Sequence, residues 1–339
     1  YLNLNYINNM EAENSFISVD WGTSNLRIRF ISDPNFQIQG EFFYNHGLKK
    51  MNEIWEESKD IFPNKKNYLL DKLLEYINKT LFEHANIKNI IISGMASYSI
   101  GIQELDYSTI PFDLFNPKII LKKIEWKEKI ISLISGIKKS DDIMRGEETQ
   151  VIGITDEFIN QDNVLIIVPG THSKHIYCNK GIITDFKTFM TGEIFNSFAE
   201  NTILSQSIEY DNFKEEYEIS FLNGLDQIKK GLSLINAAFK LRTNDLFKKK
   251  SKRDNYHFLS GLLLGEELLK LDLRKTNKII VYTNPKLAKI YTTALKHLET
   301  KKEIICIPEK KLAKSQALGQ FKIYKQSISE KSHPSNYEV

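Results

Sequence analysis

Two short polar segments, each directly after an apolar run, carry residue types that can bind phosphate. The first is Asp20–Asn25 (DWGTSN) and the second is Pro169–Lys174 (PGTHSK). Backbone N–H groups in such turns can face an anion, and a glycine lets the backbone approach closely. Asp20 would hold Mg²⁺ through water and offset the charge of a phosphate tail. Neither segment is a P-loop or a Rossmann turn, and a polar turn without a ligand remains the alternative for the first segment taken alone.

The segment Met144–Gly153 (MRGEETQVIG) contains a candidate general base. If a helix starts near Gly146, Glu147 heads an apolar stripe at i+4, i+7 and i+11, whereas Glu148 lies on a different face. An inward-pointing glutamate can accept the proton of a hydroxyl group. Two acids in a first helical turn can equally serve to complement the helix dipole, so the spacing favours neither interpretation.

The second polar segment also contains His172 and Lys174. A lone histidine in a hairpin is more often a hydrogen-bonding or substrate-contact residue, and no His/Cys spacing here supports a zinc site. Lys174, beside a Gly-Thr turn, is a candidate contact for a phosphate or carboxylate. A serine hydrolase is not expected, because the chain has no GxSxG elbow.

Apolar runs on either side of the polar segments predict the strands that position them. Phe16–Val19 and the alternating Leu26–Phe30 predict a hairpin with Asp20–Asn25 at its tip, and Val164–Val168 leads into the second turn in the same way. Since 148 residues separate the two Gly-Thr pairs, we expect two similar lobes that each contribute a hairpin to a shared cleft. The other predicted elements are helices at 66–86, 146–158, 193–202, 222–247, 258–269 and 286–298, and strands at 89–93, 175–178, 182–186, 278–283 and 303–307.

Length and composition predict a two-lobed globular protein. The 339 residues include 46 Lys+Arg and 43 Asp+Glu, and a net charge of +3 is too small to indicate nucleic acid or an anionic membrane as the main partner. The basic run at 248–253 is expected to be a solvated loop, because no aromatic residues interleave with it. Two cysteines, and no apolar run near the roughly 20 residues of a membrane span, predict a soluble cytoplasmic protein. No signal peptide is expected at residues 1–15; the chain begins with Tyr1, so it is a fragment or its start lies nearer Met10.

Five blocks along the chain resemble the 2-dehydro-3-deoxygalactonokinases of the actin-like sugar-kinase superfamily. The blocks are DWGTSNLR (Asp20–Arg27), MRGEETQVIG (Met144–Gly153), PGTHSK (Pro169–Lys174), DFKTFMTGE (Asp185–Glu193) and FLSGLLLGEE (Phe258–Glu267). They occur in family order, and the resemblance covers the chain from residue 16 to residue 320.

The resemblance implies an α/β fold of two actin-like (ribonuclease H-like) lobes with a cleft between them. We expect the N-terminal lobe at 16–143, with a C-terminal helix at 313–326 as a candidate to complete it, and the C-terminal lobe at 144–312. Residues 1–13 and 327–339 are expected to be flexible.

The function implied by the resemblance is that of an ATP- and Mg²⁺-dependent kinase. Members phosphorylate the 6-hydroxyl of 2-dehydro-3-deoxy-D-galactonate in galactonate catabolism, giving 2-dehydro-3-deoxy-6-phosphogalactonate and ADP. The implied partners are a sugar acid and ATP, with neither nucleic acid nor membrane, and a homodimer is left open. Asp20 would position Mg²⁺, and Glu147 would accept the proton of the attacking hydroxyl. The expected phosphate contacts are Gly22, Thr23, Ser24, Asn25, Gly170 and Thr171, and the expected sugar-acid contacts are Arg145, His172, Lys174 and Ser97.

Three positions depart from the family pattern. Ser97–Ile102 replaces a Gly-Ser pair and a later Gly-Trp near the expected sugar acid, so a related 2-keto-3-deoxy sugar acid is an alternative substrate. His175 stands where the family has a tryptophan. Val281–Pro285 lacks the glycine expected to approach adenosine, so a sugar-acid-binding regulatory protein with weakened catalysis is the other alternative. Pro285 is still expected to begin a helix.

Overall fold

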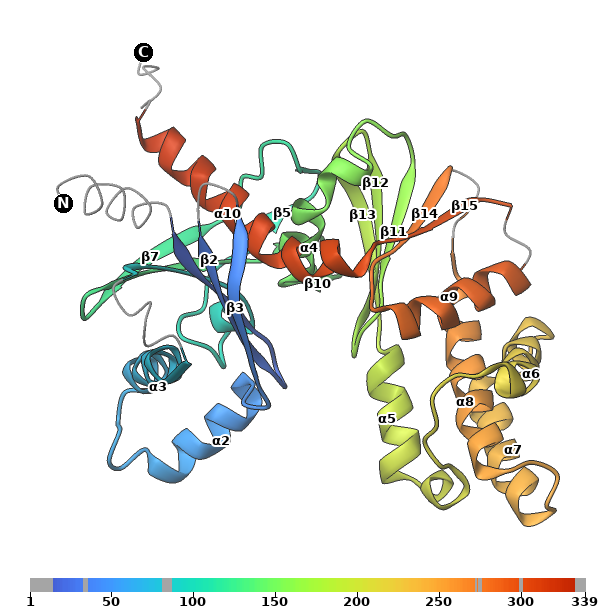
Figure 1. Ribbon diagram of the computed structural model, residues 1–339. Coiled ribbons are helices and arrows are strands. Elements are labelled where there is room, and N and C mark those ends of the chain that lie inside the picture. Colours follow the sequence, from blue (N-terminus) through green and yellow to red (C-terminus); the bar gives the residue numbers. More distant parts are fainter. Residues whose placement is uncertain are drawn as a thin grey trace. The chain divides into compact units, whose positions relative to one another are not determined.

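The computed structural model describes residues 15–32, 36–80, 87–271, 273, 276–298 and 301–332. Within these residues the chain forms two compact units (Figure 1). Unit 1 comprises the residues up to Ile159, Gly181–Ile183 and the residues from Ala313 onward; unit 2 comprises Asn160–Lys180 and Thr184–Leu312. The division therefore follows Ile159 rather than the expected position 143, and the segment that contains Glu147 belongs to unit 1.

Unit 1 is built on a six-stranded sheet in the order β3-β2-β1-β4-β8-β7. β1 (Phe16–Trp21) pairs antiparallel with β2 (Leu26–Ser32) and parallel with β4 (Asn89–Gly94), so Asp20 lies opposite Arg27 and Ser93. The predicted alternation of β2 is wrong at Arg29, which is buried and forms an ion pair with Glu41 over 3.0 Å. The remaining strands are β3 (Gln37–Tyr44), β5 (Ser108–Thr109), β6 (Phe112–Asp113), β7 (Leu121–Trp126), β8 (Lys129–Ile134), β9 (Ile137–Lys138) and β10 (Ile143–Met144).

Helices bury the sheet of unit 1. α2 (Leu48–Ser58) and α3 (Lys65–Thr80) place leucine side chains in one core with the apolar residues of β1 and β4. α4 (Glu147–Gly153) contacts α10 (Glu309–Ser332), whose Gln320 amide donates to the Val19 carbonyl over 2.8 Å. The predicted helix at 146–158 is shorter, because a 3-10 turn, Thr155–Glu157, follows α4. The predicted C-terminal helix is longer, so residues 327–332 are helical, whereas 1–13 and 333–339 lie outside the described residues.

Unit 2 repeats the strand order of unit 1. Its sheet runs β15-β14-β11-β12-β13, and the first residues of β13 also pair with β6. In unit 1, β1 pairs antiparallel with β2 and parallel with β4, and β4 pairs parallel with β8. In unit 2, β11 pairs antiparallel with β12 and parallel with β14, and β14 pairs parallel with β15. This is the ribonuclease H-like order, so the predicted actin-like α/β class is confirmed. The strands are β11 (Val164–Val168), β12 (Ser173–Asn179), β13 (Ile182–Phe189), β14 (Lys278–Val281) and β15 (Glu303–Cys306).

The helices of unit 2 differ from the prediction at two places. One predicted helix at 222–247 is two helices, because the Gly231 N–H donates back to Ile228 and ends the first. Ser251 caps α8, so Lys252 and Arg253 of the basic run belong to a helix rather than a loop. The helices are α5 (Thr191–Asn201), α6 (Glu218–Lys229), α7 (Leu234–Leu246), α8 (Lys252–Leu268) and α9 (Pro285–His297).

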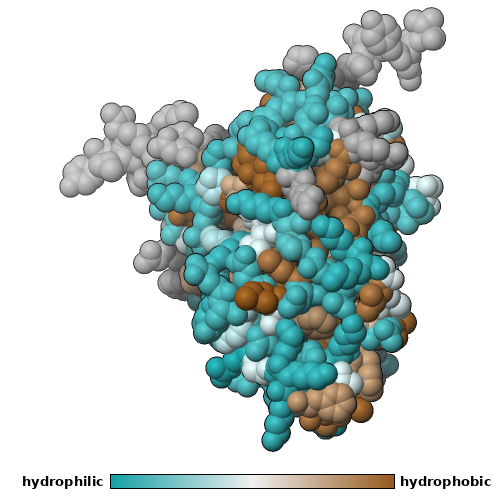
Figure 2. All heavy atoms as spheres, turned by 90° about the vertical axis from the view of Figure 1, so that its right-hand side faces the viewer, coloured by the Kyte–Doolittle hydropathy of each residue, from teal (hydrophilic) through white to brown (hydrophobic). Residues whose placement is uncertain are grey.

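The surface is mixed in character. Figure 2 shows a face on which separate hydrophobic patches are interrupted by hydrophilic residues. The large apolar side chains that unit 2 exposes include Ile219, Ile235 and Phe239. Among the described residues, none of the helices combines the length and the apolar character that spanning a membrane requires.

Candidate functional site

The first polar turn lies at the carboxyl end of β1 in the sheet of unit 1. The Gly22 N–H donates to the Asn25 carbonyl over 2.9 Å and closes the turn between β1 and β2. The carbonyls of Gly22 and Thr23 accept from N–H groups at the start of α2, over 3.0 and 3.1 Å. Thr23, Ser24 and Asn25 are exposed. The sheet and α2 thus hold the backbone of this turn, while its side chains face outward.

Asp20 and Glu147 come together across two glycines. Because β1 and β4 are parallel, Asp20 and Gly94 lie at the same end of the sheet. A Cβ on Gly94 would lie 3.4 Å from Asp20 Oδ1, and one on Gly146 would lie 3.4 Å from Gly94 Cα. Both glycines have positive φ, 91° and 111°, which other residues rarely adopt. Burial raises the pKa of Asp20; Arg27 and Arg29 oppose this rise, and Glu147 adds to it.

The two adjacent glutamates of α4 lie in different environments. Glu147 is half-buried, and its Oε2 accepts the Arg145 N–H over 3.1 Å. Glu148 is fully buried and accepts the Gly146 N–H at both oxygens, over 2.8 and 2.9 Å. Burial and the charge of Glu147 raise the pKa of Glu148 to about 8. The expectation that Glu147 is the more inward residue is therefore wrong, because packing against α10 also buries the face that carries Glu148.

Arg145 is held by the loop that departs from the family pattern. Its Nη1 donates to the carbonyl of Ser97 and, over 2.5 Å, to the hydroxyl of the same residue. Nη2 donates to the Leu105 carbonyl over 3.3 Å, and the guanidinium lies 4.2 Å from the ring centre of Tyr107. Ser97 is completely buried. Both predicted sugar-acid contacts in unit 1 thus contact each other and fix the 97–105 loop.

The second polar turn lies in unit 2, at the carboxyl end of β11. The start of α5 packs directly on this turn, because a Cβ on Gly192 would lie 2.5 Å from the Gly170 carbonyl oxygen. The next residue, Glu193, donates its N–H to the Thr171 carbonyl over 3.0 Å. The Gly170 N–H in turn points to the Ser173 hydroxyl at 3.4 Å. The turn is therefore attached both to α5 and to the first residue of β12.

His172 and Lys174 differ in exposure. The His172 imidazole is about half exposed, and its Nε2 donates to the Glu193 carboxylate over 2.5 Å. Lys174 is only 4% exposed, and its ammonium group donates to the His172 carbonyl over 3.1 Å. Of these two predicted contacts, only His172 presents its side chain at the surface.

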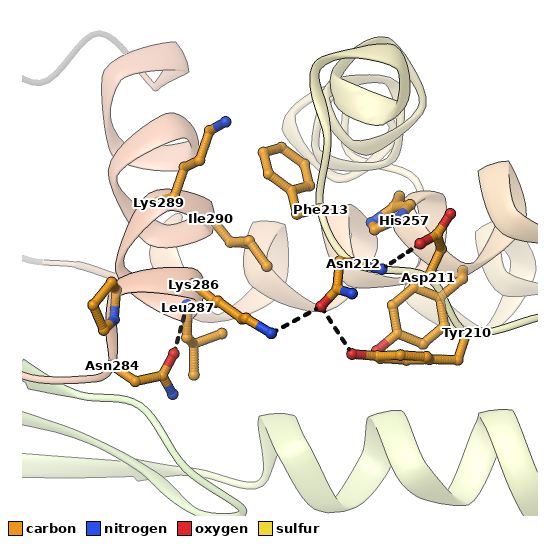
Figure 3. Close-up of a pocket in the computed structure, with 12 residues that line it drawn as sticks. Tyr210, Asp211, Asn212, Phe213, His257, Asn284, Lys286, Leu287, Lys289 and Ile290 are labelled. Carbon is orange, nitrogen blue, oxygen red and sulfur yellow. Dashed lines mark hydrogen bonds between the residues drawn. The ribbon is translucent and has the colours of Figure 1, made fainter.

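A cavity of about 580 Å³ lies at the same end of the unit 2 sheet (Figure 3). β14 is parallel to β11, and the Tyr282 N–H donates to the Ile167 carbonyl, so the chain after β14 emerges beside the chain that leads into the Gly170–Thr171 turn. Pro285 begins α9, as predicted, and the Asn284 side chain caps that helix by accepting from the Leu287 N–H. The cavity is lined by Tyr210–Phe213, Tyr256, His257, Asn284–Leu287, Lys289 and Ile290.

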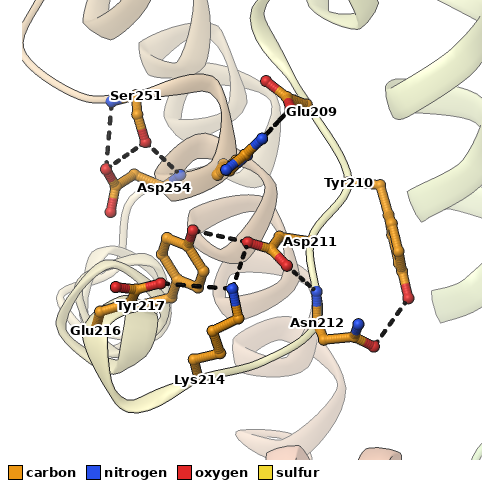
Figure 4. A network of polar contacts seen from close by, with 10 residues as sticks. Glu209, Tyr210, Asp211, Asn212, Lys214, Glu216, Tyr217, Ser251 and Asp254 are labelled. Carbon is orange, nitrogen blue, oxygen red and sulfur yellow. Dashed lines mark hydrogen bonds and ion pairs between the residues drawn. The ribbon is translucent and has the colours of Figure 1, made fainter.

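A polar network fixes the loop that forms one wall of this cavity (Figure 4). Asp211 accepts from the Tyr217 hydroxyl over 2.8 Å and from the Lys214 ammonium over 3.1 Å, and these bonds lower its pKa to about 2. Asn212 Oδ1 accepts from both Tyr210 and Lys286, so it connects this wall to α9. Behind the wall, burial lowers the pKa of His257 to about 4, and this imidazole is neutral at pH 7.

Asp20 and Glu147 are neighbouring carboxylates of unit 1 that interact electrostatically. No group of three or more His, Cys, Asp or Glu side chains within the described residues could enclose a metal. Mg²⁺ commonly binds to one or two carboxylates, several waters and substrate phosphates. The charge of Glu147 already raises the pKa of Asp20, and a cation there would relieve this repulsion.

The predicted site residues fall into two groups. Asp20, the Gly22–Asn25 turn, Ser97, Arg145 and Glu147 lie in unit 1, whereas the residues from Gly170 to Lys174 lie in unit 2. Sequence reasoning gave no role to Glu267, which is buried near the second turn, although its motif was among the five matching blocks. The aromatic and lysine residues of the cavity were also missed, because they carry no recognisable spacing.

Comparisons with known proteins show the family of this chain. The family model described as 2-keto-3-deoxy-galactonokinase matches residues 20–314. A 2-dehydro-3-deoxygalactonokinase from Rhizobium meliloti (strain 1021) is 28% identical over 265 residues, which are 76% of this chain and 81% of that protein. The 2-dehydro-3-deoxygalactonokinase of Escherichia coli K12 is 26% identical over 183 residues, 53% of this chain and 60% of that protein. The crystal structure of a 2-dehydro-3-deoxygalactonokinase protein from Sinorhizobium meliloti, 24% identical, has the same fold with a TM-score of 0.73, covering 96% of this chain and 99% of that one. This chain therefore belongs to the 2-keto-3-deoxy-galactonokinase family.

Proposed function

We propose that this chain transfers the γ-phosphoryl group of ATP to the 6-hydroxyl of 2-dehydro-3-deoxy-D-galactonate. Membership in the family supports the reaction and the substrate. The observation that carries the proposal is the convergence of Asp20 and Glu147 at one end of the unit 1 sheet, across Gly94 and Gly146. Phosphoryl transfer needs little covalent chemistry from the protein, so positioned charges and dipoles supply most of the catalysis.

We assign Glu147 the role of general base. Its carboxylate accepts the proton of the 6-hydroxyl as that oxygen attacks the γ-phosphorus. Asp20 is the carboxylate that would hold Mg²⁺, and the ion would neutralise charge on the phosphates. The Gly22–Asn25 turn of unit 1 is a proposed phosphate contact, and so is the Gly170–Thr171 turn of unit 2, because such turns present backbone N–H donors to anions. Arg145 orders the 97–105 loop, which we expect to contact the sugar acid.

The cavity of unit 2 is the proposed site of the adenosine part of ATP. Ligands of open α/β sheets bind beyond the carboxyl ends of the strands, and the cavity and the Gly170–Thr171 turn both lie there. Aromatic side chains such as Tyr210 and Phe213 can contact a base, and Lys286 adds positive charge. The Val281–Pro285 turn lacks the glycine of the family pattern, and its Asn284 side chain caps α9, so the helix has a defined start there.

The test is sugar-acid-dependent ADP release by the purified chain and two variants. Glu147→Gln removes the proposed base, and we expect kcat to fall by about 10²–10⁴-fold with little change in the KM for ATP. Asp156→Asn is the matched control, because this exposed carboxylate follows α4 closely and is expected to leave kcat unchanged. A folded Glu147→Gln protein with the wild-type kcat would contradict the assignment.

A further inference from the structure

A buried carboxylate lies where four elements of unit 2 meet. Glu267, near the end of α8, is 1% exposed. His175 Nε2, from β12, donates to it over 2.8 Å, and the Tyr291 hydroxyl, from α9, lies 3.1 Å from each of its oxygens. The Thr191 hydroxyl, at the start of α5, donates to its Oε2. Three donors around one buried carboxylate replace the water that it loses on folding.

The Tyr291 hydroxyl keeps its proton at neutral pH. Burial and the nearby Glu267 raise the pKa of Tyr291 well above its usual value, so its hydroxyl can only donate to the carboxylate. His175 Nδ1 is buried and has no hydrogen-bond partner within the described residues, so this imidazole bonds to Glu267 through Nε2 alone. Glu267 is thus the common acceptor of the cluster.

Two connections lead from Glu267 to the Gly170–Thr171 turn. The first passes through Thr191 to the start of α5, where Gly192 packs against Gly170 and the Glu193 N–H donates to Thr171. The second passes through the Tyr291 hydroxyl, 3.1 Å from the Ser173 hydroxyl, toward which the Gly170 N–H points. Glu267 is therefore connected to the turn through α5 and, separately, through Tyr291 and Ser173.

We infer that Glu267 is a positioning residue that sets the Gly170–Thr171 turn in the conformation that binds the phosphates of ATP. The inference rests on the proposed function, in which this turn contacts the nucleotide phosphates. Glutamine has nearly the same shape, but its amide NH₂ cannot accept a hydrogen bond. Glu267→Gln would therefore remove one of the two acceptor oxygens and weaken either the Thr191 or the Tyr291 connection.

The experiment compares the binding of ATP with that of adenosine by calorimetry in the full chain. A misplaced phosphate turn weakens only the ligand that carries phosphates, whereas general damage to unit 2 weakens both. For Glu267→Gln we expect the Kd of ATP to rise by about tenfold or more, and the Kd of adenosine to stay unchanged. Glu266→Gln is the matched control on the same helix, and both affinities should match the wild type.

Thr191→Val cuts only the connection to α5 and should produce a smaller loss of the same kind. If Glu267→Gln does not fold, Thr191→Val decides the question. The inference is overturned if the folded variants keep the wild-type preference for ATP, or if they lose affinity for ATP and adenosine equally. A wild-type chain that binds ATP no better than adenosine would instead contradict the proposed phosphate site, so the two failures are distinguishable.

Discussion

At the residue scale, Glu147 and Glu148 show how neighbouring identical side chains acquire different chemistry. Glu147 stays half-buried beside Asp20, where a carboxylate can accept a proton. Glu148 is buried and bonded to the Gly146 N–H, which holds the bend that presents Glu147. A helical pattern could not predict this, because the φ of 111° at Gly146 sets the start of α4 and α10 covers its other face.

The pKa of Glu148 predicts a pH dependence of stability. The carboxyl group has an ordinary pKa of 4.5 and a pKa of about 8 in the folded chain, so between these values the folded state binds a proton that the unfolded state does not. The contribution of this group to the free energy of unfolding is therefore largest below pH 4.5. It falls by about 1.4 kcal/mol per pH unit between pH 4.5 and pH 8, and it is lost above pH 8. Urea unfolding between pH 6.5 and 8.5 measures this slope.

Glu148→Gln mimics the protonated side chain, so we expect the variant to lose this part of the slope. Glu157→Gln, a nearby half-buried acid, serves as the control and should keep it. Identical slopes for Glu148→Gln and the wild type would show that the buried carboxyl group does not hold its proton in the folded chain.

At the scale of the elements, α4 depends on a close crossing with α10. A Cβ on Gly153 would lie 1.8 Å from the Ser315 carbonyl oxygen, and one on Gly319 would lie equally close to the Thr149 carbonyl oxygen. The backbones of α4 and α10 therefore lie in direct contact at these two glycines, where larger side chains would separate them. Because α4 carries Glu147, this crossing helps to fix the proposed base.

Gly153→Ala should separate α4 from α10. We expect a loss of about 1–3 kcal/mol in the free energy of unfolding, together with a lower kcat, because Glu147 would move with its helix. Chemical denaturation and steady-state kinetics on the same preparation measure both effects. Gln150→Ala, in the same helix, is the control. A Gly153→Ala protein of wild-type stability would contradict the described crossing.

The strands around the turns were the most predictable elements, because a local pattern specifies each one. Alternating or continuous apolar runs placed β1, β2, β11 and β14 within a few residues. The cluster around Glu267 was not predictable from such patterns, since its members lie as much as 118 residues apart in sequence and meet only in the folded unit. The buried Arg29 was missed for a similar reason: its partner Glu41 comes from the next strand.

At the scale of the whole molecule, the repeated strand order explains why each unit presents a polar Gly-Thr turn at the end of its first strand. In each unit the first strand lies in the sheet between the second and the fourth strands, and its carboxyl end leads into a turn with a Gly-Thr pair. The block at residues 144–153 supplies Glu148, and the block at 258–267 supplies Glu267. Two copies of one architecture thus carry different side chains, with the proposed acid–base chemistry in unit 1 and the proposed adenosine site in unit 2.

The most direct test of the central claim is the phosphorus NMR spectrum of the product formed from ATP, Mg²⁺ and 2-dehydro-3-deoxy-D-galactonate. We expect ADP and a phosphate monoester in equal amounts, with the phosphorus coupled to the two protons of a primary carbon, as in a 6-phosphate. The epimer of this substrate at C4 should give a lower kcat/KM. ADP release without an ester, an ester at another carbon, or a clear preference for the epimer would contradict the assignment.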